Sequence, residues 1–466
     1  MQKIYIKNFG PIKEAEIEIN RLLVIIGEQA TGKSTISKLI YFFKSLGDDL
    51  FNQFYKSERE FLDITEDLII PIREKYYDIF GSTFHLPQFE IRYYFSADKW
   101  LLLTLDAETK KLRPEFSSDF MCNDFKNDLR NVKQSIKNVE RKIKSTNNLH
   151  EQLALEQEKL KLIQELSNLI NKAFENKQND SLYVIAGRNA TVGYSALFEK
   201  YLFASLQTKI EENRKQAFKT KEQTIDETLL LKFIERVLKV KGLFEKYNNT
   251  AGLINSLPDN ATNINVLRIT EQKMLQILKG KYRIDSFGEK IMHENNKYVY
   301  LNNASSGQQE IIRILQDIFI VLYEKQKAFR IIEEPEAHLF PLAQKHIVEL
   351  FALLINQNTE NQIIITTHSP YIITAINNLL FAKRVVDANN EVENEVENII
   401  PSAYHLESSW LSAYSLSKNN TYCENILNDK TGLIKQTYLD SVSDLLGSDF
   451  TNLYNLHKQK YANTTR

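Results

Sequence analysis

The residues with the clearest chemical potential form one continuous stretch, Gly27-Glu28-Gln29-Ala30-Thr31-Gly32-Lys33-Ser34-Thr35. Its spacing matches the phosphate-cradling pattern G-x-x-x-x-G-K-[ST]. The glycines let the backbone bend so that its N–H groups point inward at an anion. Lys33 would reach the β- and γ-phosphates of a nucleotide, and Ser34 would hold Mg²⁺. We therefore assign nucleotide binding to Gly27, Gln29, Ala30, Thr31, Gly32, Lys33, Ser34 and Thr35.

The elements around this stretch are those that the chemistry requires. Residues 22–26 form a short apolar run with the length and β-branching of a buried strand. Apolar residues then recur at helical spacing from Ile36 to Leu46. The new helix adds the positive end of its dipole to the anion site. A chance glycine turn beside an exposed lysine is the alternative, and the flanking strand and helix disfavour it.

A pair of adjacent carboxylates, Glu333 and Glu334, ends a second apolar run, residues 329–332. Neighbouring residues in a strand point to opposite sides. One carboxylate can therefore face the Mg²⁺ of the phosphate loop while the other faces an attacking water. We assign Glu333 to the metal and Glu334 to the water. Glutamates at a strand end are often only solvated, but the upstream phosphate loop favours the functional interpretation.

Two further stretches complete the chemistry. The apolar run at residues 361–366 leads to His368, at the carboxyl end of a predicted strand, where ligands bind in open α/β sheets. There His368 could hydrogen-bond a γ-phosphate, although a lone histidine is often structural. Ser305, Ser306, Gly307 and Gln308 open another helix and form a second candidate anion site. Taken alone, this motif is also typical of an ordinary helix cap.

The composition excludes several classes of protein. The chain has 466 residues, 43% hydrophobic and 26% charged, with a formal net charge of −1, so no global basic field indicates nucleic acid. The two cysteines indicate neither a disulfide framework nor a metal site, which fits a reducing cytoplasm. No run approaches the 18 or so apolar residues of a membrane span. The N-terminus predicts a strand, not a signal peptide.

The composition changes between residues 125 and 177, where glycine and proline vanish. One apolar stripe joins Leu129, Val132, Ile136, Val139 and Ile143, and a second joins Leu149, Leu153, Leu160, Ile163, Leu166 and Ile170. The polar residues 145–148 separate the two, which predicts an antiparallel helical hairpin with arms of about 20 residues, or about 30 Å. The hairpin is either an arm that docks a partner or simply a pair of surface helices.

Other segments carry weaker signals. Residues 181–189 predict a strand that ends at a glycine turn with an exposed arginine, Arg188. Residues 194–246 predict mostly helix, and residues 249–264 predict a loop. Lys273, Lys279, Lys281 and Arg283 form a local basic stretch, which is either a solvated face or a nucleic-acid contact. The tail, including residues 410–414 and 439–443, predicts small helical elements.

Together the four chemical stretches resemble the ABC-type ATPases of the RecF, SMC and overcoming-lysogenisation-defect group. The resemblance covers the start of the chain and residues 300–385. It implies that residues 27–35 are Walker A, residues 305–309 the signature motif, residues 331–334 Walker B with its catalytic glutamate, and His368 the switch histidine. It also implies that two heads clamp ATP, with the signature motif acting in trans. The metal-side acid of the family is usually aspartate, so Glu333 predicts slow hydrolysis.

The phrases at residues 332–341 and 366–371 look most like stand-alone ATPases of bacterial anti-phage systems, such as the Septu, PARIS and retron-associated ATPases. Relatives of the overcoming-lysogenisation-defect type carry a Toprim nuclease after the switch histidine, but residues 386–466 lack the acidic cluster that it needs. We therefore expect a nuclease or toxin to be a separate chain. The alternatives are a DNA-clamping repair or chromosome ATPase, a transporter subunit, which the long spacing before Walker B disfavours, and a module that binds nucleotide without turnover.

The prediction as a whole is a cytoplasmic, non-membrane α/β protein with a P-loop ABC-type ATPase head, a mixed sheet with flanking helices. An inserted helical-hairpin coiled coil and a helical second lobe complete it. It uses ATP and Mg²⁺ and forms a homodimer or higher homo-oligomer, with DNA as a possible partner. The expected boundaries are residues 1–120 for the first part of the head, 121–180 for the hairpin, 181–300 for the second lobe, 301–385 for the rest of the head, and 386–466 for a helical extension.

Overall fold

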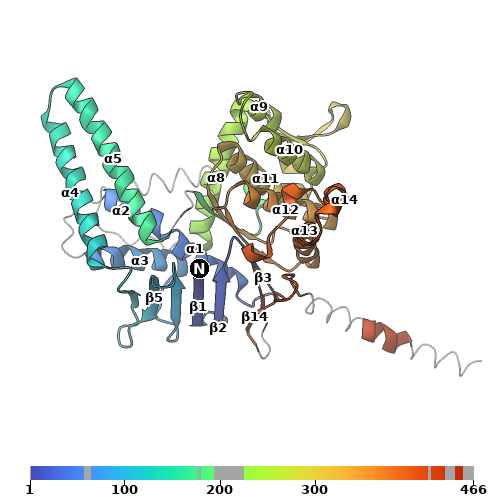
Figure 1. The fold of residues 1–466 in the computed structure, drawn as a ribbon, viewed down its shortest axis with the longest axis horizontal. Helices are drawn as coiled ribbons and strands as arrows, with labels where there is room; N and C mark the ends of the chain where they lie inside the picture. Colours follow the sequence, from blue (N-terminus) through green and yellow to red (C-terminus); the bar gives the residue numbers. More distant parts are fainter. Residues whose placement is uncertain are drawn as a thin grey trace, which may run out of the picture.

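The computed structural model describes residues 2–56, 64–175, 177, 180–193, 225–417, 421–435 and 447–454. Figure 1 shows a body of two sheets and their helices, with a long helical hairpin rising on one side and a helical lobe on the other. The chain therefore has an α/β fold, a mixed sheet with flanking helices, as the sequence predicts.

The central sheet has six strands in the order β14-β13-β3-β12-β11-β7. Its strands are β3 (Leu22–Gly27), β7 (Asp180–Val184), β11 (Ala328–Glu333), β12 (Gln362–Thr367), β13 (Leu411–Leu416) and β14 (Cys423–Asn425). All neighbouring pairs are parallel except β13 with β14. Parallel strands need covering on both faces, and the continuous apolar runs of β3, β11 and β12 fit that requirement.

Side chains of β3 alternate between two hydrophobic cores, as the two-residue period of a strand requires. Leu22, Val24 and Ile26 pack into the core formed with α11 (Ser306–Glu324), α12 (Pro341–Gln357) and α13 (Pro370–Ala388). Leu23 and Ile25 pack into the core formed with α1 (Lys33–Lys44). The strand that leads into the phosphate loop is thus fixed from both sides.

A second, antiparallel sheet of five strands completes the α1 side, in the order β2-β1-β4-β5-β6. Its strands and the helices that cover it are β1 (Gln2–Phe9), β2 (Ile12–Ile19), β4 (Glu90–Tyr94), β5 (Trp100–Leu105), β6 (Leu112–Phe116), α2 (Leu46–Lys56) and α3 (Ile64–Phe80). Sequence reasoning missed β6, whose proline lies on the edge strand of the sheet, where proline is tolerated.

The projecting hairpin consists of α4 (Asn123–Ser145) and α5 (Leu149–Ala173), which pack along each other (Figure 1). The α4 stripe is buried at Leu129, Val132, Ile136 and Val139. The predicted α5 stripe divides. Leu166 and Ile170 are buried, whereas Leu149, Leu153 and Leu160 are exposed. This outer part of the stripe was wrongly expected to pack in the hairpin.

The second lobe contains α6 (Ala190–Gly193), α8 (Ile225–Tyr247), α9 (Thr250–Asn255), α10 (Ile264–Leu278) and a three-stranded sheet of β8 (Lys281–Asp285), β9 (Gly288–Met292) and β10 (Tyr298–Tyr300). The expected loop at residues 249–264 is wrong in part, because α9 lies there, started by an Asn249 cap that accepts from the Gly252 N–H. The helix expected over residues 194–224 lies outside the described residues. None of the described helices combines the length and the hydropathy of a membrane span.

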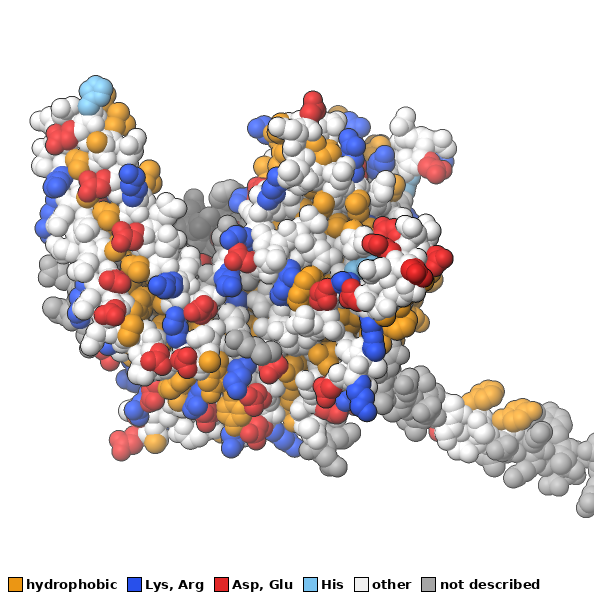
Figure 2. All heavy atoms as spheres, viewed as in Figure 1, with side chains coloured by type: hydrophobic (Ala, Val, Ile, Leu, Met, Phe, Trp, Pro, Cys, Tyr) orange, Lys and Arg blue, Asp and Glu red, His pale blue; other side chains and the backbone are white. Residues whose placement is uncertain are grey.

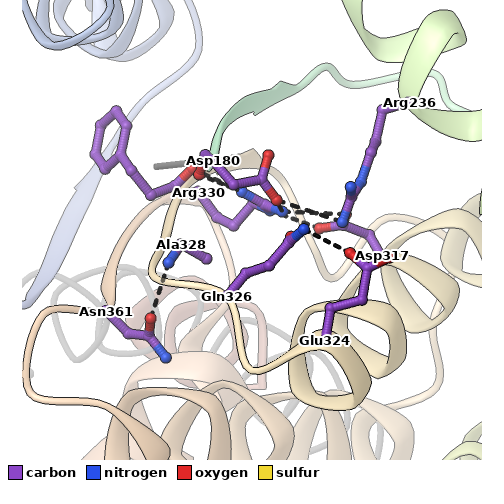
Figure 3. Close-up of polar contacts among 9 residues, drawn as sticks. Asp180, Arg236, Asp317, Glu324, Gln326, Ala328, Arg330 and Asn361 are labelled. Carbon is purple, nitrogen blue, oxygen red and sulfur yellow. Dashed lines mark hydrogen bonds and ion pairs between the residues drawn. The ribbon is translucent and has the colours of Figure 1, made fainter. Parts of the chain in front are cut away.

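A buried charge cluster fastens this lobe to the central sheet (Figure 3). Arg330 of β11 donates to the carboxylates of Asp317 of α11 and Asp180 of β7, each at 2.6 Å. Arg236 of α8 donates to the other Asp317 oxygen at 2.6 Å. Because the two arginines and two aspartates balance in charge, none is left unpaired in a low-dielectric interior. The cluster fixes the strand that ends in the candidate catalytic carboxylates.

The tail differs most from expectation. Residues 410–414 were expected to be helical, but residues 411–416 form β13, which pairs with β3 along its whole length. The helix α14 (Glu393–Ile399) precedes it. Residues 439–443 lie outside the described part, and residues 447–454 are helical with every side chain exposed. Strands β13 and β14 at one side of the central sheet therefore come from the tail.

Candidate active site

The predicted chemical stretches converge at one edge of the central sheet. Strand β12 pairs in parallel with both β3 and β11, so the carboxyl ends of the three strands lie side by side. The phosphate loop follows β3, the two glutamates end β11, and His368 follows β12. Segments separated by some three hundred positions in the sequence thus meet at the place where open α/β sheets bind their ligands.

The phosphate loop adopts conformations that its glycines make possible. Gly27 and Gly32 both have positive φ angles, of 157° and 94°. A Cβ atom on Gly27 would lie 2.4 Å from the Leu416 carbonyl oxygen, so a side chain does not fit there. Thr31 closes the loop by donating to the Glu28 carbonyl at 2.8 Å. The exposed Ser34 lies in the first turn of α1.

Of the remaining loop residues, Gln29 and Ala30 are exposed and Thr35 is half-buried.

Lys33 lies inside the loop. Its Nζ donates to the carbonyls of Gly27 and Glu28, each at 2.8 Å. Burial lowers the pKa of Lys33, while the nearby carboxylates of Glu334, Glu336 and Glu333 act in the opposite direction. Lys33 therefore shares an electrostatic environment with the carboxylates at the end of β11.

Glu333 is buried, and both of its oxygens are engaged. Tyr183 of β7 donates its hydroxyl to Oε1 at 2.7 Å, and the Ala186 N–H donates to Oε2 at 3.2 Å. The Tyr183 hydroxyl also lies 2.8 Å from Oγ of Ser37, which is one turn beyond Ser34 on α1. Glu333 is thus linked to the helix that carries Ser34. A metal ion that it binds must use the remaining lone pairs of these oxygens.

Glu334 and His368 face each other, with Glu334 Oε1 3.3 Å from His368 Nε2. Glu334 has a positive φ of 43°, and its backbone N–H donates to the Thr366 carbonyl at 2.9 Å. The departure from strand geometry turns its partly exposed side chain out of the sheet edge. A carboxylate and an imidazole in this position can orient a water molecule and accept its proton.

Glu336 is a site residue that sequence reasoning missed. Its Oε1 accepts from the Thr367 hydroxyl at 2.7 Å and from the His368 N–H at 2.8 Å, whereas its Oε2 is buried with no hydrogen-bond partner. An unpartnered carboxylate oxygen suits the oxygen-only preference of Mg²⁺. The described residues contain no preformed cluster of three or more acidic, histidine or cysteine ligands. Nucleotide phosphates are the usual source of the other ligands.

Arg188 contradicts the expectation of an exposed arginine, because it is 0% exposed. Its guanidinium donates to the carbonyls of Glu333 at 2.6 Å and Glu334 at 3.0 Å. Its Nε donates to the Glu310 carbonyl on α11 at 3.2 Å and lies 3.4 Å from the Glu310 carboxylate. Burial lowers the pKa of Arg188, and the surrounding carboxylates oppose that effect. Arg188 therefore joins the backbone of the two glutamates to the signature helix.

The signature residues begin α11 with a complete capping box. Ser305 Oγ accepts from the Gln308 N–H, and Gln308 Oε1 accepts from the Ser305 N–H at 3.1 Å. A Cβ atom on Gly307 would lie 2.5 Å from the His338 carbonyl oxygen, so glycine allows this close approach. Ser305 and Ser306 are exposed. The cap engages the Ser305 hydroxyl, but the exposure of both serines leaves the surface of this helix start accessible to a ligand or a second chain.

The tail forms part of the phosphate loop's surroundings, which the sequence did not indicate. Tyr422, just before β14, donates its hydroxyl to the Thr31 carbonyl. The same hydroxyl would lie 2.8 Å from a Cβ atom on Gly32. Together with the Leu416 carbonyl beside Gly27, Tyr422 confines the loop from the side opposite to β12.

Exposed apolar side chains lie in the segments next to the site. Phe340 and Leu342 follow the β11 loop, and Tyr371 follows His368; all three are exposed.

Comparisons with known proteins place these observations in context. A family model described as "AAA ATPase domain" matches residues 1–373, about four fifths of the chain. The SMC head domain from Thermotoga maritima matches with a TM-score of 0.34 and 10% identity, over 91% of this chain and 98% of that one.

An Smc head domain with an extended coiled coil, bound to the C-terminal domain of ScpA derived from Pyrococcus furiosus, matches with a TM-score of 0.35 and 11% identity, over 96% and 100%. The recombination mediator protein RecF matches with a TM-score of 0.29 and 12% identity, over 79% and 92%. Because all of these TM-scores are below 0.5, the solved structures carry no further weight. A comparison with curated proteins gave no match.

Proposed function

The chain belongs to the AAA ATPase domain family, and we propose that it binds ATP with Mg²⁺ in the edge site and hydrolyses it slowly. We further propose that ATP pairs two heads, and that pairing regulates a separate effector in bacterial anti-phage defence. The observation that carries the proposal is the convergence of Lys33, Glu334 and His368 at the ends of three adjacent strands. A cytoplasmic location is part of the same proposal.

The phosphate loop and the carboxylates have separate tasks in this proposal. The inward N–H groups of residues 27–35 hold the phosphates, and Lys33 moves from its carbonyl partners to a phosphate oxygen. Ser34 and Glu333 hold the metal, with the free oxygen of Glu336 as an additional ligand. When bound, Mg²⁺ neutralises charge that develops on the phosphate oxygens.

Hydrolysis depends on Glu334 and His368. Glu334 accepts a proton from the attacking water, and His368 holds Glu334 and hydrogen-bonds the γ-phosphate oxygen. Slow turnover is supported by Glu333. Its side chain is one methylene longer than that of the usual aspartate, and its carboxylate is already held by Tyr183 and Ala186. Mg²⁺ demands near-ideal octahedral geometry, so a ligand fixed by other partners adapts poorly.

Pairing of two heads is supported by the exposed serines at the start of α11 and by the exposed Phe340, Leu342 and Tyr371. The free N–H groups of a helix start attract phosphate. In this arrangement Ser305, Ser306, Gly307 and Gln308 of one head contact the nucleotide on the other head, in trans. The apolar residues become buried as the heads close.

The experiment that tests the enzymatic part compares Lys33→Ala and Glu334→Gln with the unchanged chain. We expect Lys33→Ala to abolish binding of a fluorescent ATP analogue, because the phosphates lose their cation. Glu334→Gln keeps the shape of the side chain but removes the base, so it should bind ATP, lose phosphate release and accumulate as the paired form in light scattering. Undiminished ATP affinity in Lys33→Ala, or normal hydrolysis by Glu334→Gln, would contradict the assigned roles.

Regulation of an effector is supported by the exposed leucines of α5, Leu149, Leu153 and Leu160. They recur on one face of the outer hairpin, where Figure 2 shows hydrophobic side chains among charged ones. An exposed apolar stripe far from the nucleotide is suited to docking another chain. The likeness of residues 332–341 and 366–371 to stand-alone anti-phage ATPases supports the defence role.

The effector proposal is tested with Leu153→Glu and Leu160→Glu combined. The matched control is Ala154→Glu combined with Lys161→Glu, two exposed positions with the same spacing on the same helix but off the leucine stripe. The product of the adjacent open reading frame should co-purify with the control and not with the leucine variant, while ATP binding stays the same in both. On cells that carry both genes, the efficiency of phage plating should be higher with the leucine variant and with Lys33→Ala than with the unchanged chain. Unchanged co-purification and plating would refute the docking role.

A DNA-clamping ATPase is the second candidate. Helix α4 favours it, because seven of its side chains are basic and three are acidic. In that case affinity for duplex DNA should require ATP and fall steeply with salt. ATP-independent or absent duplex binding would leave the effector proposal as the only candidate.

A further inference from the structure

The three-stranded sheet of the second lobe has one buried and one exposed face. Tyr282, Ile284 and Ile291 are buried in the core of the lobe. The strand registers place Lys281, Met292 and Tyr298 in one row across the opposite face, and Arg283, Lys290 and Tyr300 in the next. The β8–β9 turn adds Phe287 beside them. We call this opposite face the aromatic platform.

Three aromatic rings of the platform surround one lysine. The Lys290 Nζ lies 5.2 Å from the ring centre of Phe287, 4.7 Å from that of Tyr298 and 5.4 Å from that of Tyr300. Asp285 holds the same ammonium group at 2.8 Å. These contacts fix the rings before any ligand arrives, so a ligand that stacks on them orders little additional side-chain freedom.

The rings nevertheless remain open to solvent. Phe287 is 78% exposed, Tyr298 47% and Tyr300 37%. Lys290 itself is buried, so the rings and not the ammonium group form the solvent-facing part of this contact. Three exposed rings on one small sheet form an apolar surface that folding of the chain itself does not require.

Among the described residues around the platform, exposed basic side chains outnumber exposed acidic ones, of which Glu294 beside β10 is one. Lys281 and Arg283 on β8 and Lys297 before β10 are exposed. Asp285, the acidic residue on this face of β8, is committed to Lys290. The basic residues of β8 and the tyrosines of β10 lie on strands that are two positions apart in the sheet, a separation of about 10 Å. Glu289 points to the other face, where Arg313 binds it.

We propose that the aromatic platform binds single-stranded nucleic acid. Bases stack on Phe287, Tyr298 and Tyr300, and phosphates lie against Lys281, Arg283 and Lys297. Exposed aromatic rings with a basic border are the combination that recognises unpaired bases, whose faces a duplex hides. DNA and RNA bases both stack on aromatic rings, so the platform predicts a single-stranded nucleic acid of either kind. The binding experiment below distinguishes DNA from RNA.

The platform is directly connected to the signature motif. Only four residues, 301–304, separate Tyr300 from Ser305. Gln308 of the capping box donates to the Leu278 carbonyl at the end of α10, the helix that leads into β8, at 2.7 Å. If ATP pairs the heads as proposed above, nucleic acid bound to the platform can shift the start of α11, which contacts the nucleotide. This coupling rests on the proposed function, whereas the binding itself does not.

The test measures fluorescence anisotropy of labelled oligothymidylate and oligouridylate, without nucleotide and on the full chain. Phe287→Ala and Tyr298→Ala should each weaken binding by about 5-fold to 100-fold, because each removes a stacking surface. Tyr298→Phe keeps the ring and should keep the affinity. The matched control is Phe84→Ala, since Phe84 is equally exposed, at 76%, but lies outside the platform. Tighter binding of oligothymidylate indicates DNA as the ligand, and tighter binding of oligouridylate indicates RNA.

The charge is tested separately. Lys281→Glu combined with Arg283→Glu should reduce binding, whereas Arg113→Glu on the exposed edge strand β6 should not. With about three phosphate contacts, the affinity should fall about 20-fold between 50 and 200 mM salt.

Three outcomes would overturn the proposal: no binding of either oligomer at low salt, equal affinity for a duplex, or an acidic peptide that binds while the oligomers do not. Lys33→Ala should bind the oligomers normally, so failure of the ATP site and failure of the platform are distinguishable.

Discussion

Arg188→Met should damage stability and catalysis by separable routes. The side chain is fully buried and pairs with Glu310, which is 2% exposed. Methionine preserves much of the volume but leaves the Glu310 carboxylate without its cation, and leaves the carbonyls of Ile185, Glu333 and Glu334 without a donor. Breaking one buried ion pair costs about 3–5 kcal/mol of unfolding free energy.

The magnitude can be expressed as a melting temperature. For a cooperative unit of 150–250 residues, 1 kcal/mol corresponds to about 2–4 °C, so the expected fall in Tm is about 6–20 °C. Adding Glu310→Gln to Arg188→Met removes the unpaired charge and should recover at least half of that fall. The assay is thermal unfolding followed by circular dichroism on the single variants and the double variant, which forms a double-mutant cycle.

Catalysis should respond differently from stability. The guanidinium holds the carbonyl of Glu334, whose positive φ directs its carboxylate at His368. Without this donor Glu334 is misplaced, and a misplacement of about 1 Å reduces kcat by about 100-fold. Glu310→Gln does not restore that donor, so the double variant should regain Tm but not kcat. An Arg188→Met protein with unchanged Tm and kcat would refute this account of the residue.

The other predictions concern pairing and pH. Ser306→Arg adds a large cation at the exposed start of α11, so it should leave the Tm unchanged but abolish ATP-dependent pairing and turnover, measured by light scattering and phosphate release; normal pairing would contradict the trans site. Lys44 is buried, which lowers its pKa to about 7, so the unfolded chain binds more protons than the folded chain between about pH 7 and pH 10.5 and stability should rise with pH across that range. Lys44→Met should raise the Tm at pH 7 and flatten this rise, and an unchanged pH profile would show that Lys44 is not the group responsible.

The phosphate loop and the carboxylate pair could be predicted because each is a contiguous pattern with its own strand. Residues 22–35 contain the strand, the turn and the lysine in one stretch, and residues 329–334 contain a strand and both acids. Their meeting followed from a general property of parallel sheets, that carboxyl ends share one edge. Local patterns and this one rule were enough.

The remaining parts of the site depend on contacts that no local pattern encodes. Arg188 follows a glycine turn, which suggests solvent, and its burial depends on Glu310, 122 positions away. Strand β13 contains serines and a tyrosine in a polar tail, and only pairing with β3 makes it a buried strand. The apolar stripe of α5 is buried at Leu166 and Ile170 but exposed at Leu149, Leu153 and Leu160, and the sequence does not reveal where it leaves the contact. Glu336 was overlooked because its significance lies in an oxygen left without a partner.

Strand β13 also determines when the central sheet can be completed during translation. Strand β3 appears among the first thirty residues, but its neighbour on one side is residues 411–416. During translation one edge of the strand that leads into the phosphate loop therefore stays unpaired until residues 411–416 have been synthesised. An unpaired edge invites aggregation, so the nascent head should depend on chaperones until then. Ribosomes that stall before codon 416 should yield fragments that cannot retain nucleotide.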